Sequence, residues 1–267
     1  EENSVTATAA GAAYNDKNVA GANKVGYTGL ALTGTGAGNY TLAATTAEGT
    51  GTITPKELNL ALANGVRFDK IYDGNANVTQ AFTKGGNYTL TGFVGTEGTG
   101  IELESATGRY ADKNAGTDKN VTFDGLSLIG TGAGNYALDK TALTGTGTIT
   151  RRALALGAVG AQSKTYDGTT VADASKFRAA LGNAIAGDSV TAAAAGAAYN
   201  DKNVARANRI DYPGVALRGA DAGNYSLAAT TAQGAGTITP RDLTLTADAK
   251  KIVQGEPLPS FTGRGEG

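Results

Sequence analysis

Apolar residues alternate with small or polar residues along most of the chain, and this period of two is typical of half-buried β-strands. The alternation is clearest in three segments: VGYTGLALTG (25–34), VTFDGLSLIG (121–130) and IDYPGVALRG (210–219). In each segment the alternation shifts by one residue at a glycine, namely Gly29, Gly125 or Gly214. These shifts predict a bulge or a tight bend at the same place in three equivalent segments.

Another alternating run, NYTLAATTAEGTGTIT (39–54), is followed after Pro55 by leucines at every second position. This predicts one extended segment that leaves a structural unit and enters the next, with the proline where a missing N–H is tolerated. Pro240 stands at the same place, whereas Arg151 shows that proline is optional there. Evidence for helices is weak: FRAALGNAIAG (177–187) could form only a short turn rich in Ala and Gly.

Four markers recur in one order, YDG, YxDKN, AGNY and TIT, at a period of about 90 residues. The tyrosines of YxDKN are Tyr14, Tyr110 and Tyr199, and those of AGNY are Tyr40, Tyr136 and Tyr225. Both sets are 96 and 89 residues apart, and Tyr72 and Tyr166 of YDG are 94 apart. This period is too long for one turn of a solenoid and suits small domains in tandem.

The order of the markers divides the chain into parts of a tandem array. Residues 1–55 form the C-terminal half of one repeat, 56–150 and 151–240 are full repeats, and 241–267 begins another. The chain is therefore expected to be a window from a longer protein. A second phasing stays open, since SVTATAAG (4–11) resembles SVTAAAAG (189–196) and would make 1–97 the first whole domain.

Many short strands separated by turn signals predict an all-β fold. We expect tandem small β-sandwich, immunoglobulin-like repeats of about 90 residues arranged end to end. A single parallel β-helix is the alternative architecture, but it predicts a shorter period.

Composition narrows the possible partners. The chain has no Cys, Met, Trp or His, and its net charge is −1. This charge gives no electrostatic basis for binding nucleic acid, and no apolar run approaches the ~18 residues of a membrane span. We therefore expect no nucleic-acid partner and no membrane insertion. The start EENSV lacks the regions of a signal peptide, so any export signal is expected outside this sequence.

The AGNY motif combines two residue types that tolerate positive φ with a tyrosine: Gly38 and Asn39, Gly134 and Asn135, Gly223 and Asn224. A tyrosine after such a turn is expected to bury its ring and donate its hydroxyl to a backbone carbonyl, as in the tyrosine corner of sandwich domains. The alternative is that this tyrosine stacks on a sugar. Tyr88 is the one tyrosine outside these markers and the three alternating segments, and it would be the first candidate if the fragment bound a ligand.

The YDG motif predicts a turn in which Asp73 or Asp167 accepts a backbone N–H and Gly74 or Gly168 closes the turn. The segment DGNAN (73–77) also has the spacing that opens a calcium loop. However, the twelfth position is a lysine where such a loop needs glutamate, so no metal site is predicted.

The YxDKN motif has two interpretations. In the first it is a turn whose Asp and Asn bind the backbone while Lys points to solvent. In the second, a lysine and an asparagine from another strand form an isopeptide crosslink beside a carboxylate, as some surface adhesin domains do. The recurring sets are Asp16, Lys17 and Asn18; Asp112, Lys113 and Asn114; and Asp201, Lys202 and Asn203.

The composition also argues against catalysis. Without His and Cys, the commonest general base and the strongest nucleophile are missing. A carboxylate pair could still hydrolyse a glycoside, but the recurring Asp residues lie in turn motifs. GTGAGNY is glycine-rich but opens no convincing helix, so it does not predict a nucleotide site. We expect no enzyme, no catalytic residue and no cofactor.

The motifs KTYDGTTVA (164–172), AYNDKNVA (198–205), GADAGNYSLA (219–228) and GTITPRDLTL (236–245) together resemble the YDG-type repeats of large secreted bacterial adhesins. These are filamentous-haemagglutinin-like exoproteins, many of them exported by two-partner secretion. KKIVQGEPLPSF (250–261) is similar to the start of an MBG-type repeat. The resemblance brings no established ligand residues, so the ligand-binding residues stay unknown.

The resemblance implies a secreted protein at the bacterial cell surface, with a part in adhesion, biofilm formation and virulence. One hypothesis is that the repeats are a structural stalk that projects a binding region. The alternative is that the repeats themselves bind glycan or self-associate as adhesive modules. Expected partners are therefore a host-cell or matrix glycan, neighbouring repeats of the same adhesin, and an outer-membrane secretion partner for the parent protein.

Overall fold

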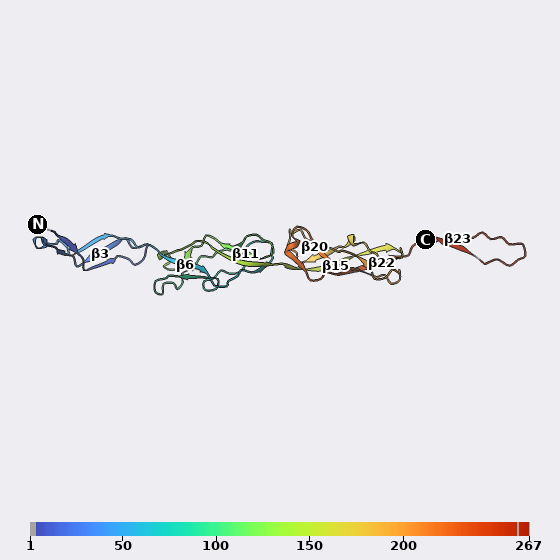
Figure 1. Ribbon diagram of the computed structural model, residues 1–267, viewed down its shortest axis with the longest axis horizontal. Coiled ribbons are helices and arrows are strands. Elements are labelled where there is room, and N and C mark those ends of the chain that lie inside the picture. The colour runs from blue at the N-terminus through green and yellow to red at the C-terminus, as the bar shows by residue number, and fades with distance from the viewer. Residues whose placement is uncertain (1–3, 261, 267) are drawn as a thin grey trace. The chain divides into compact units, whose positions relative to one another are not determined.

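The computed structural model of the protein describes residues 4–260 and 262–266 and is all-β (Figure 1). Within these residues the helical turns are short 3-10 turns: η1 (Ala37–Asn39), η2 (Ala133–Asn135), η3 (Ala174–Lys176) and η4 (Ala222–Asn224). The predicted class, tandem β-rich domains, is confirmed. The start of EENSV, and two positions of the predicted MBG-type start (261 and 267), lie outside the described residues.

The chain forms two compact units. The first contains Glu1–Lys70, Ala76–Lys113 and Thr117–Thr148, and the second contains Ile71–Asn75, Asn114–Gly116 and Ile149–Gly267. Three short segments of the sequence repeat 56–150 therefore belong to the second unit. The first carries YDG, the second begins at the asparagine of YxDKN, and the third is residues 149–150.

Residues 4–55 form small sheets with little core. The strands are β1 (Thr6–Thr8), β2 (Gly11–Tyr14), β3 (Lys24–Thr28), β4 (Ala31–Thr33) and β5 (Thr46–Thr50). The strand β3 lies between β2 and β5, whereas β4 pairs with β1. Gly29, with φ of 63°, lies between β3 and β4, so the predicted bend is where the chain passes from one sheet to another. Among the described residues of this segment, only Ala22 is a buried apolar side chain.

The repeat 56–150 forms three sheets. Its strands are β6 (Lys56–Leu62), β7 (Lys70–Ile71), β8 (Tyr88–Thr91), β9 (Glu102–Leu103), β10 (Arg109–Tyr110), β11 (Gly116–Phe123), β12 (Leu128–Ile129), β13 (Tyr136–Leu138) and β14 (Leu143–Thr150). The sheet orders are β13-β6-β8, β10-β11-β14-β7 and β12-β9. The core contains Phe68, Phe82 and Phe123, with the last two rings stacked at 4.1 Å.

The repeat 151–240 uses the same plan with a longer first strand. Its strands are β15 (Arg152–Thr165), β16 (Ala179–Gly182), β17 (Thr191–Ala193), β18 (Ala198–Tyr199), β19 (Arg209–Tyr212), β20 (Ala216–Arg218), β21 (Tyr225–Leu227) and β22 (Ala232–Thr239). The main sheet has the order β16-β15-β22-β19-β18, and β17 pairs with β20. Part of 177–187, predicted as at most a short turn, forms the edge strand β16.

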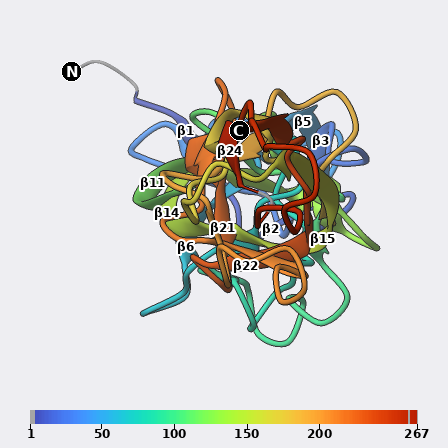
Figure 2. The ribbon, with the colours of Figure 1, turned by 90° about the vertical axis from the view of Figure 1, so that its right-hand side faces the viewer.

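The strand β15 takes part in two pairings in turn, as expected where a strand passes between the sheets of a sandwich. Its first residues pair in parallel with β21, and its last residues pair in parallel with β22 (Figures 1 and 2). The pairing with β21 ends at Leu154 and the pairing with β22 begins at Val159, and the register of the second pairing shifts between Val159 and Gln162. In the preceding repeat the two corresponding pairings are made by two separate strands, since β6 pairs with β13 and β7 pairs with β14.

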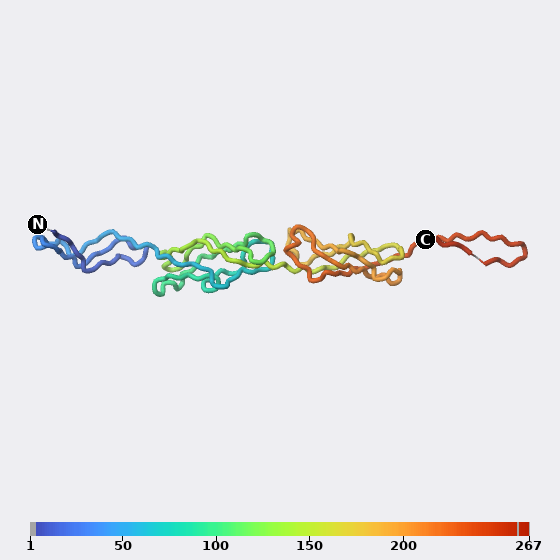
Figure 3. The backbone as a smooth tube through the Cα atoms, in the orientation of Figure 1, coloured from blue at the N-terminus to red at the C-terminus, as the bar shows by residue number. Residues whose placement is uncertain are grey.

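The strands β23 (Thr244–Ala247) and β24 (Gly263–Glu266) pair as a hairpin near the end of the chain. The backbone between them forms a long loop (Figure 3). Both strands are exposed along their whole length, so this hairpin adds no core to the repeat before it.

Glycine is required at one position in each copy, at the end of the strand before AGN. These residues are Gly34, Gly130 and Gly219, with φ of 110°, 114° and 114°. A Cβ at any of them would lie within 2.2 Å of a backbone carbonyl oxygen. Both the positive φ and the close contact exclude a side chain, because other residues rarely adopt this backbone conformation.

Replacement of Gly219 by alanine is therefore expected to destabilise the third repeat by about 1–3 kcal/mol. Gly223 is the matched control, because it lies four residues further on, has no positive φ and has open space around its Cα. Gly223→Ala should change the free energy of unfolding by less than about 1 kcal/mol. Urea unfolding of the two variants measures the difference, and equal stabilities would contradict the steric argument.

Candidate functional site

The AGN part of AGNY forms a single 3-10 turn in all three copies. Its glycine and asparagine were singled out because they tolerate positive φ, but neither residue has positive φ in any copy. The left-handed glycine lies four residues earlier, where a Cβ would meet a carbonyl oxygen. The turn therefore presents an asparagine side chain and then starts an extended segment at the tyrosine.

The tyrosines that follow this turn are buried in the two full repeats. Tyr136 is 6 % exposed and Tyr225 is 2 % exposed, so little ring face is left for a sugar. Their hydroxyls were predicted to donate to a backbone carbonyl, which is wrong: Tyr136 donates to Glu97 at 2.6 Å and Tyr225 to Asp188 at 2.5 Å. Each hydroxyl also accepts a backbone N–H.

A tyrosine bond to a backbone carbonyl does occur, but in the YxDKN motif. The Tyr110 hydroxyl donates to the carbonyl of Phe68, and both residues are buried. The other tyrosine singled out from the sequence, Tyr88, is 2 % exposed and its hydroxyl accepts the N–H of Leu103. It is a core residue, which excludes it as a surface platform for a ligand.

The YDG motif forms the predicted turn. Asp73 accepts the N–H of Asn75, and Asp167 accepts the N–H of Thr169 at 2.9 Å. Gly74 and Gly168 have φ of 83° and 76°.

The YxDKN motif also forms a turn in which the aspartate accepts the N–H of the asparagine: Asp16 binds Asn18 and Asp201 binds Asn203, each at 2.8 Å. Lys17 is exposed and makes an ion pair with Glu97 at 3.6 Å. These are non-covalent roles, and an isopeptide crosslink stays a hypothesis without a known partner.

The YxDKN turn also forms hydrogen bonds with the AGN turn of the next repeat. In the first unit, the Asn135 side-chain oxygen accepts the N–H of Val19 at 2.9 Å, and its Nδ2 donates to the Asn18 oxygen at 2.8 Å. One side-chain amide thus binds two groups of the preceding repeat at once. We call this pair of hydrogen bonds the amide clasp.

The same clasp recurs in the second unit. The Asn224 side-chain oxygen accepts the N–H of Ala115 at 2.8 Å, and its Nδ2 donates to the Asn114 oxygen at 3.2 Å. Asn224 is only 4 % exposed. Because both clasps use the same atoms of the same two motifs, the clasp is a property of the repeat.

Beside the second clasp lies a cluster of two tyrosines and one carboxylate. Tyr72 of YDG packs edge-on against Tyr225 with ring centroids 5.4 Å apart, and it is fully buried. Both hydroxyls donate to the same oxygen of Asp188. Burial and the hydrogen bond to Asp188 raise the pKa of Tyr225 above its ordinary value. This cluster joins YDG of one repeat to AGNY of the next.

The carboxylate beside Tyr136 in the first unit is Glu97, which also pairs with Lys17 of the preceding repeat. The hydrogen bond to Glu97 raises the pKa of the Tyr136 hydroxyl. Both repeat junctions therefore combine an amide clasp with a tyrosine–carboxylate hydrogen bond.

The recurring asparagines, tyrosines and carboxylates of this site join polypeptide segments of successive repeats. The described residues contain no group of three acidic, His or Cys side chains that could hold a metal ion. In the same residues, the structure has no helix of the length and apolarity needed to cross a bilayer.

The joining role of the asparagines was not predicted from the sequence. The signal was present, because each YxDKN asparagine recurs with an AGNY asparagine of the following repeat, 117 residues on for Asn18 and 110 for Asn114. Recurrence alone does not distinguish a residue that stabilises its own turn from one that binds the next repeat.

The comparisons with known proteins identify one family. The YDG domain model matches residues 54–144 and 150–232, one match for each full repeat. A search of curated proteins finds no match.

Replacement of Asn224 by alanine is expected to destabilise the third repeat by about 1–3 kcal/mol, because the N–H of Ala115 loses its acceptor. Asn39 is the matched control, since it occupies the same motif position and makes no side-chain hydrogen bond within the described residues. Asn39→Ala should change stability by less than about 0.5 kcal/mol. Hydrogen exchange of the Ala115 N–H measures this hydrogen bond directly, because loss of the bond should speed the exchange. An unchanged exchange rate in Asn224→Ala would contradict the amide clasp.

Stability is expected to fall in alkaline solution. The pKa values of four tyrosines are raised, those of Tyr88, Tyr199 and Tyr225 mainly by burial and that of Tyr136 mainly by Glu97. A raised pKa contributes stability that is complete below the ordinary value of about 10 and is lost as the pH rises through the folded value.

Urea unfolding between about pH 9 and about pH 11 measures this loss. Tyr225→Phe should show a shallower decline, because one titrating group is absent. A decline as steep as that of the unmodified chain would mean that Tyr225 does not contribute.

Proposed function

Since the chain belongs to the YDG-domain family, we propose that its repeats are structural spacers of a secreted bacterial surface adhesin, which project a binding region for attachment or biofilm formation. In this proposal the repeats are not enzymes, and they act outside the cell. Their partners within the adhesin are the neighbouring repeats.

The observation that carries this proposal is the recurring amide clasp. A flexible string of domains needs no contact between neighbours, and domain motion is then the default. Here Asn135 and Asn224 bind the preceding repeat through the same two hydrogen bonds. A spacer needs contacts between each repeat and the next, and the clasp is such a contact, made by residues that the repeat itself supplies.

The use of the recurring polar residues also supports a structural role. The carboxylates Asp73 and Asp167 shape turns, and Glu97 and Asp188 accept hydrogen bonds from tyrosine hydroxyls. The markers that define the family motif in this chain are thus engaged in turns, core and junctions.

A second candidate function is binding by the repeats themselves, with glycan as the expected ligand. It is favoured by a shallow hollow of about 450 Å³ that recurs beside the AGNY turn in all three copies. The residues that line it include one leucine from each side and the AGNY tyrosine, for example Leu128, Leu138 and Tyr136. Repetition of a weak site would raise the overall affinity through multivalency.

Binding of the purified, folded chain to a broad glycan array and to intact host cells separates the two functions. A spacer is expected to show no saturable binding, with the heat-unfolded chain as the control for non-specific adhesion. Saturable binding would overturn the spacer proposal.

If saturable binding occurs, Ala137→Arg with Ser226→Arg places a charged side chain beside the hollow in both full repeats. Loss of binding in that variant would assign the ligand to the hollow.

A further inference from the structure

Tyr88 closes the gap between the edge strands of two sheets in the second repeat. It lies on β8, at one end of the order β13-β6-β8, and its hydroxyl accepts the N–H of Leu103 on β9 at 2.9 Å. Its ring centroid lies 4.9 Å from that of Phe82, and the residue is 2 % exposed. A phenol in this place thus contacts both an aromatic ring and a backbone N–H.

The third repeat has an alanine at the position of Tyr88. The fifth residue of β6 pairs with Leu90 on β8, and the fifth residue of β15 pairs with Leu181 on β16. Two residues before these leucines stand Tyr88 and Ala179. One side of the gap therefore carries a methyl group where the second repeat has a phenol ring.

The facing strand differs in the same sense. In the second repeat Leu103 on β9 pairs with Leu128, and in the third repeat Ala192 on β17 pairs with Leu217. Leu128 and Leu217 are equivalent, because each lies three residues after the glycine of the bend. The third repeat thus lacks both a tyrosine ring and a leucine side chain that the second repeat has here.

A hollow of about 470 Å³ lies between these strands in the third repeat. Its walls include Phe177, Ala179 and Leu181 on the side of β16, and Val190, Thr191 and Ala192 on the side of β17. Volumes of about 300–1,000 Å³ are typical of sites for small molecules. We call it the β16–β17 hollow; it is separate from the hollow beside the AGNY turn of the same repeat.

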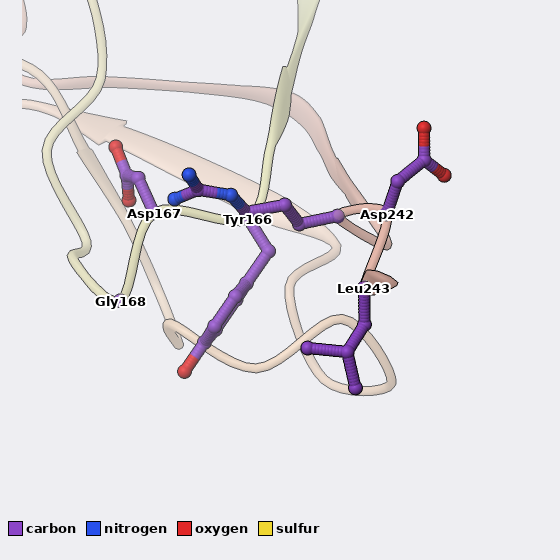
Figure 4. A pocket seen from close by; sticks show the side chains of 6 residues that line it. Tyr166, Asp167, Gly168, Asp242 and Leu243 are labelled. Atoms are coloured by element: carbon purple, nitrogen blue, oxygen red, sulfur yellow. The ribbon is translucent and has the colours of Figure 1, made fainter. Parts of the chain in front are cut away.

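The residues that line the β16–β17 hollow differ from those through which a following repeat would bind. At the junction of the second and third repeats, the second repeat contributes Tyr72 of YDG. The corresponding Tyr166 lines another pocket with residues 241–243, and it extends toward the same side as Leu243 (Figure 4). The two pockets share no lining residue among those that the structure describes, so the β16–β17 hollow belongs to one complete repeat.

The backbone N–H that binds the tyrosine hydroxyl has a counterpart in the third repeat. The Glu104 N–H donates to the carbonyl of Ser127, so the N–H of the neighbouring Leu103 points away from β12 and reaches the tyrosine hydroxyl. Because β17 pairs with β20 in the same register, the N–H of Ala192 is directed away from β20 in the same way. The methyl group of Ala179 offers this N–H no acceptor, so a ligand can supply one.

The aromatic wall is also present in the third repeat. In the second repeat Phe82 stacks on Phe123 at 4.1 Å and carries the tyrosine on its other contact. In the third repeat Phe177 packs edge-on against Tyr212, the equivalent of Phe123, at 5.0 Å. Phe177 thus holds the place of Phe82 and offers a ring to an aromatic ligand.

Arg178 is the charged residue among the described residues that line the β16–β17 hollow. Its Nη1 donates to the carbonyls of Ser175 at 2.8 Å and Phe177 at 2.7 Å, which holds the guanidinium in place. A guanidinium attracts carboxylates and repels cationic groups. A ligand that carries a negative charge beside its ring is therefore favoured.

We propose that the third repeat binds a small phenolic carboxylate in the β16–β17 hollow. The ring of the ligand takes the place that the Tyr88 ring has in the second repeat, against Phe177. Its hydroxyl accepts the N–H of Ala192, and its carboxylate lies on the side of Arg178. The second repeat carries the same group as part of its own chain.

A small molecule is the expected occupant because the hollow has the volume of a whole ligand rather than of one side chain. The inference goes beyond the spacer proposal, because it gives one repeat a ligand of its own. Absence of phenol binding would leave the spacer proposal unaffected, since that proposal is tested with glycans and host cells.

Titration of the whole chain with para-hydroxyphenylacetate, followed by NMR of the backbone N–H groups, tests the proposal. Saturable shifts are expected at Ala192 and its neighbours, with a dissociation constant of about 1 mM or lower. Phenylacetate lacks the hydroxyl and should bind at least about threefold more weakly, because the N–H of Ala192 then has no acceptor.

Two variants fill the hollow with side chains of the second repeat. Ala179→Tyr restores the tyrosine and Ala192→Leu restores the leucine, and each should weaken binding at least about tenfold. Ala180→Tyr is the matched control, because Ala180 is exposed and lies on the opposite face of β16. The control should bind within about twofold of the unmodified chain. The NMR spectrum of each variant verifies that it keeps the fold.

Three results would overturn the proposal. The first is the absence of saturable shifts at Ala192. The second is equal affinity for phenylacetate and para-hydroxyphenylacetate. The third is unchanged affinity in a folded Ala179→Tyr or Ala192→Leu chain.

Discussion

An asparagine side chain holds successive repeats together, because a primary amide donates and accepts hydrogen bonds at the same time. Asn135 and Asn224 each accept a backbone N–H and donate to a second asparagine of the preceding repeat. An aspartate could not make both bonds, because an ionised carboxylate only accepts. The 3-10 turn before the tyrosine strand sets the position of this amide, and the tyrosine that follows anchors the turn in the core.

The strand that enters each repeat links this junction to the rest of the domain. Only Arg151 separates β14 from β15, so the last strand of one repeat continues almost directly into the first strand of the next. The strand β15 then serves two pairings, first with β21 beside the AGN turn and later with β22. The tyrosine of YxDKN is buried in both full repeats, since Tyr110 and Tyr199 are each 4 % exposed, whereas Tyr14 is 48 % exposed.

Much of the fold could be predicted from local sequence patterns. Period-two alternation gave the strands, and glycines where the alternation shifts gave the bends, since both depend on neighbouring residues alone. The YDG and YxDKN turns were predictable for the same reason, because Asp73 and Asp16 bind residues two positions away. The order of the markers divides the chain into the parts 1–55, 56–150, 151–240 and 241–267. This division into repeats stays a prediction.

The errors concern contacts made across large separations in sequence. The carboxylates that bind Tyr136 and Tyr225 lie 39 and 37 residues away, in loops that differ between the repeats, so no recurring pattern marked them. The amide clasp spans more than 100 residues and needs the knowledge that two turns meet. The fold of the turn itself was misread because glycine next to asparagine is common both in left-handed turns and in 3-10 turns.

Pairing of β15 with β22 in parallel has a mechanical consequence. A pull along the chain acts on the N-terminal end of β15 and on the C-terminal end of β22, which are opposite ends of the pair. The strands would have to slide past each other, so their hydrogen bonds are loaded together instead of opening one by one.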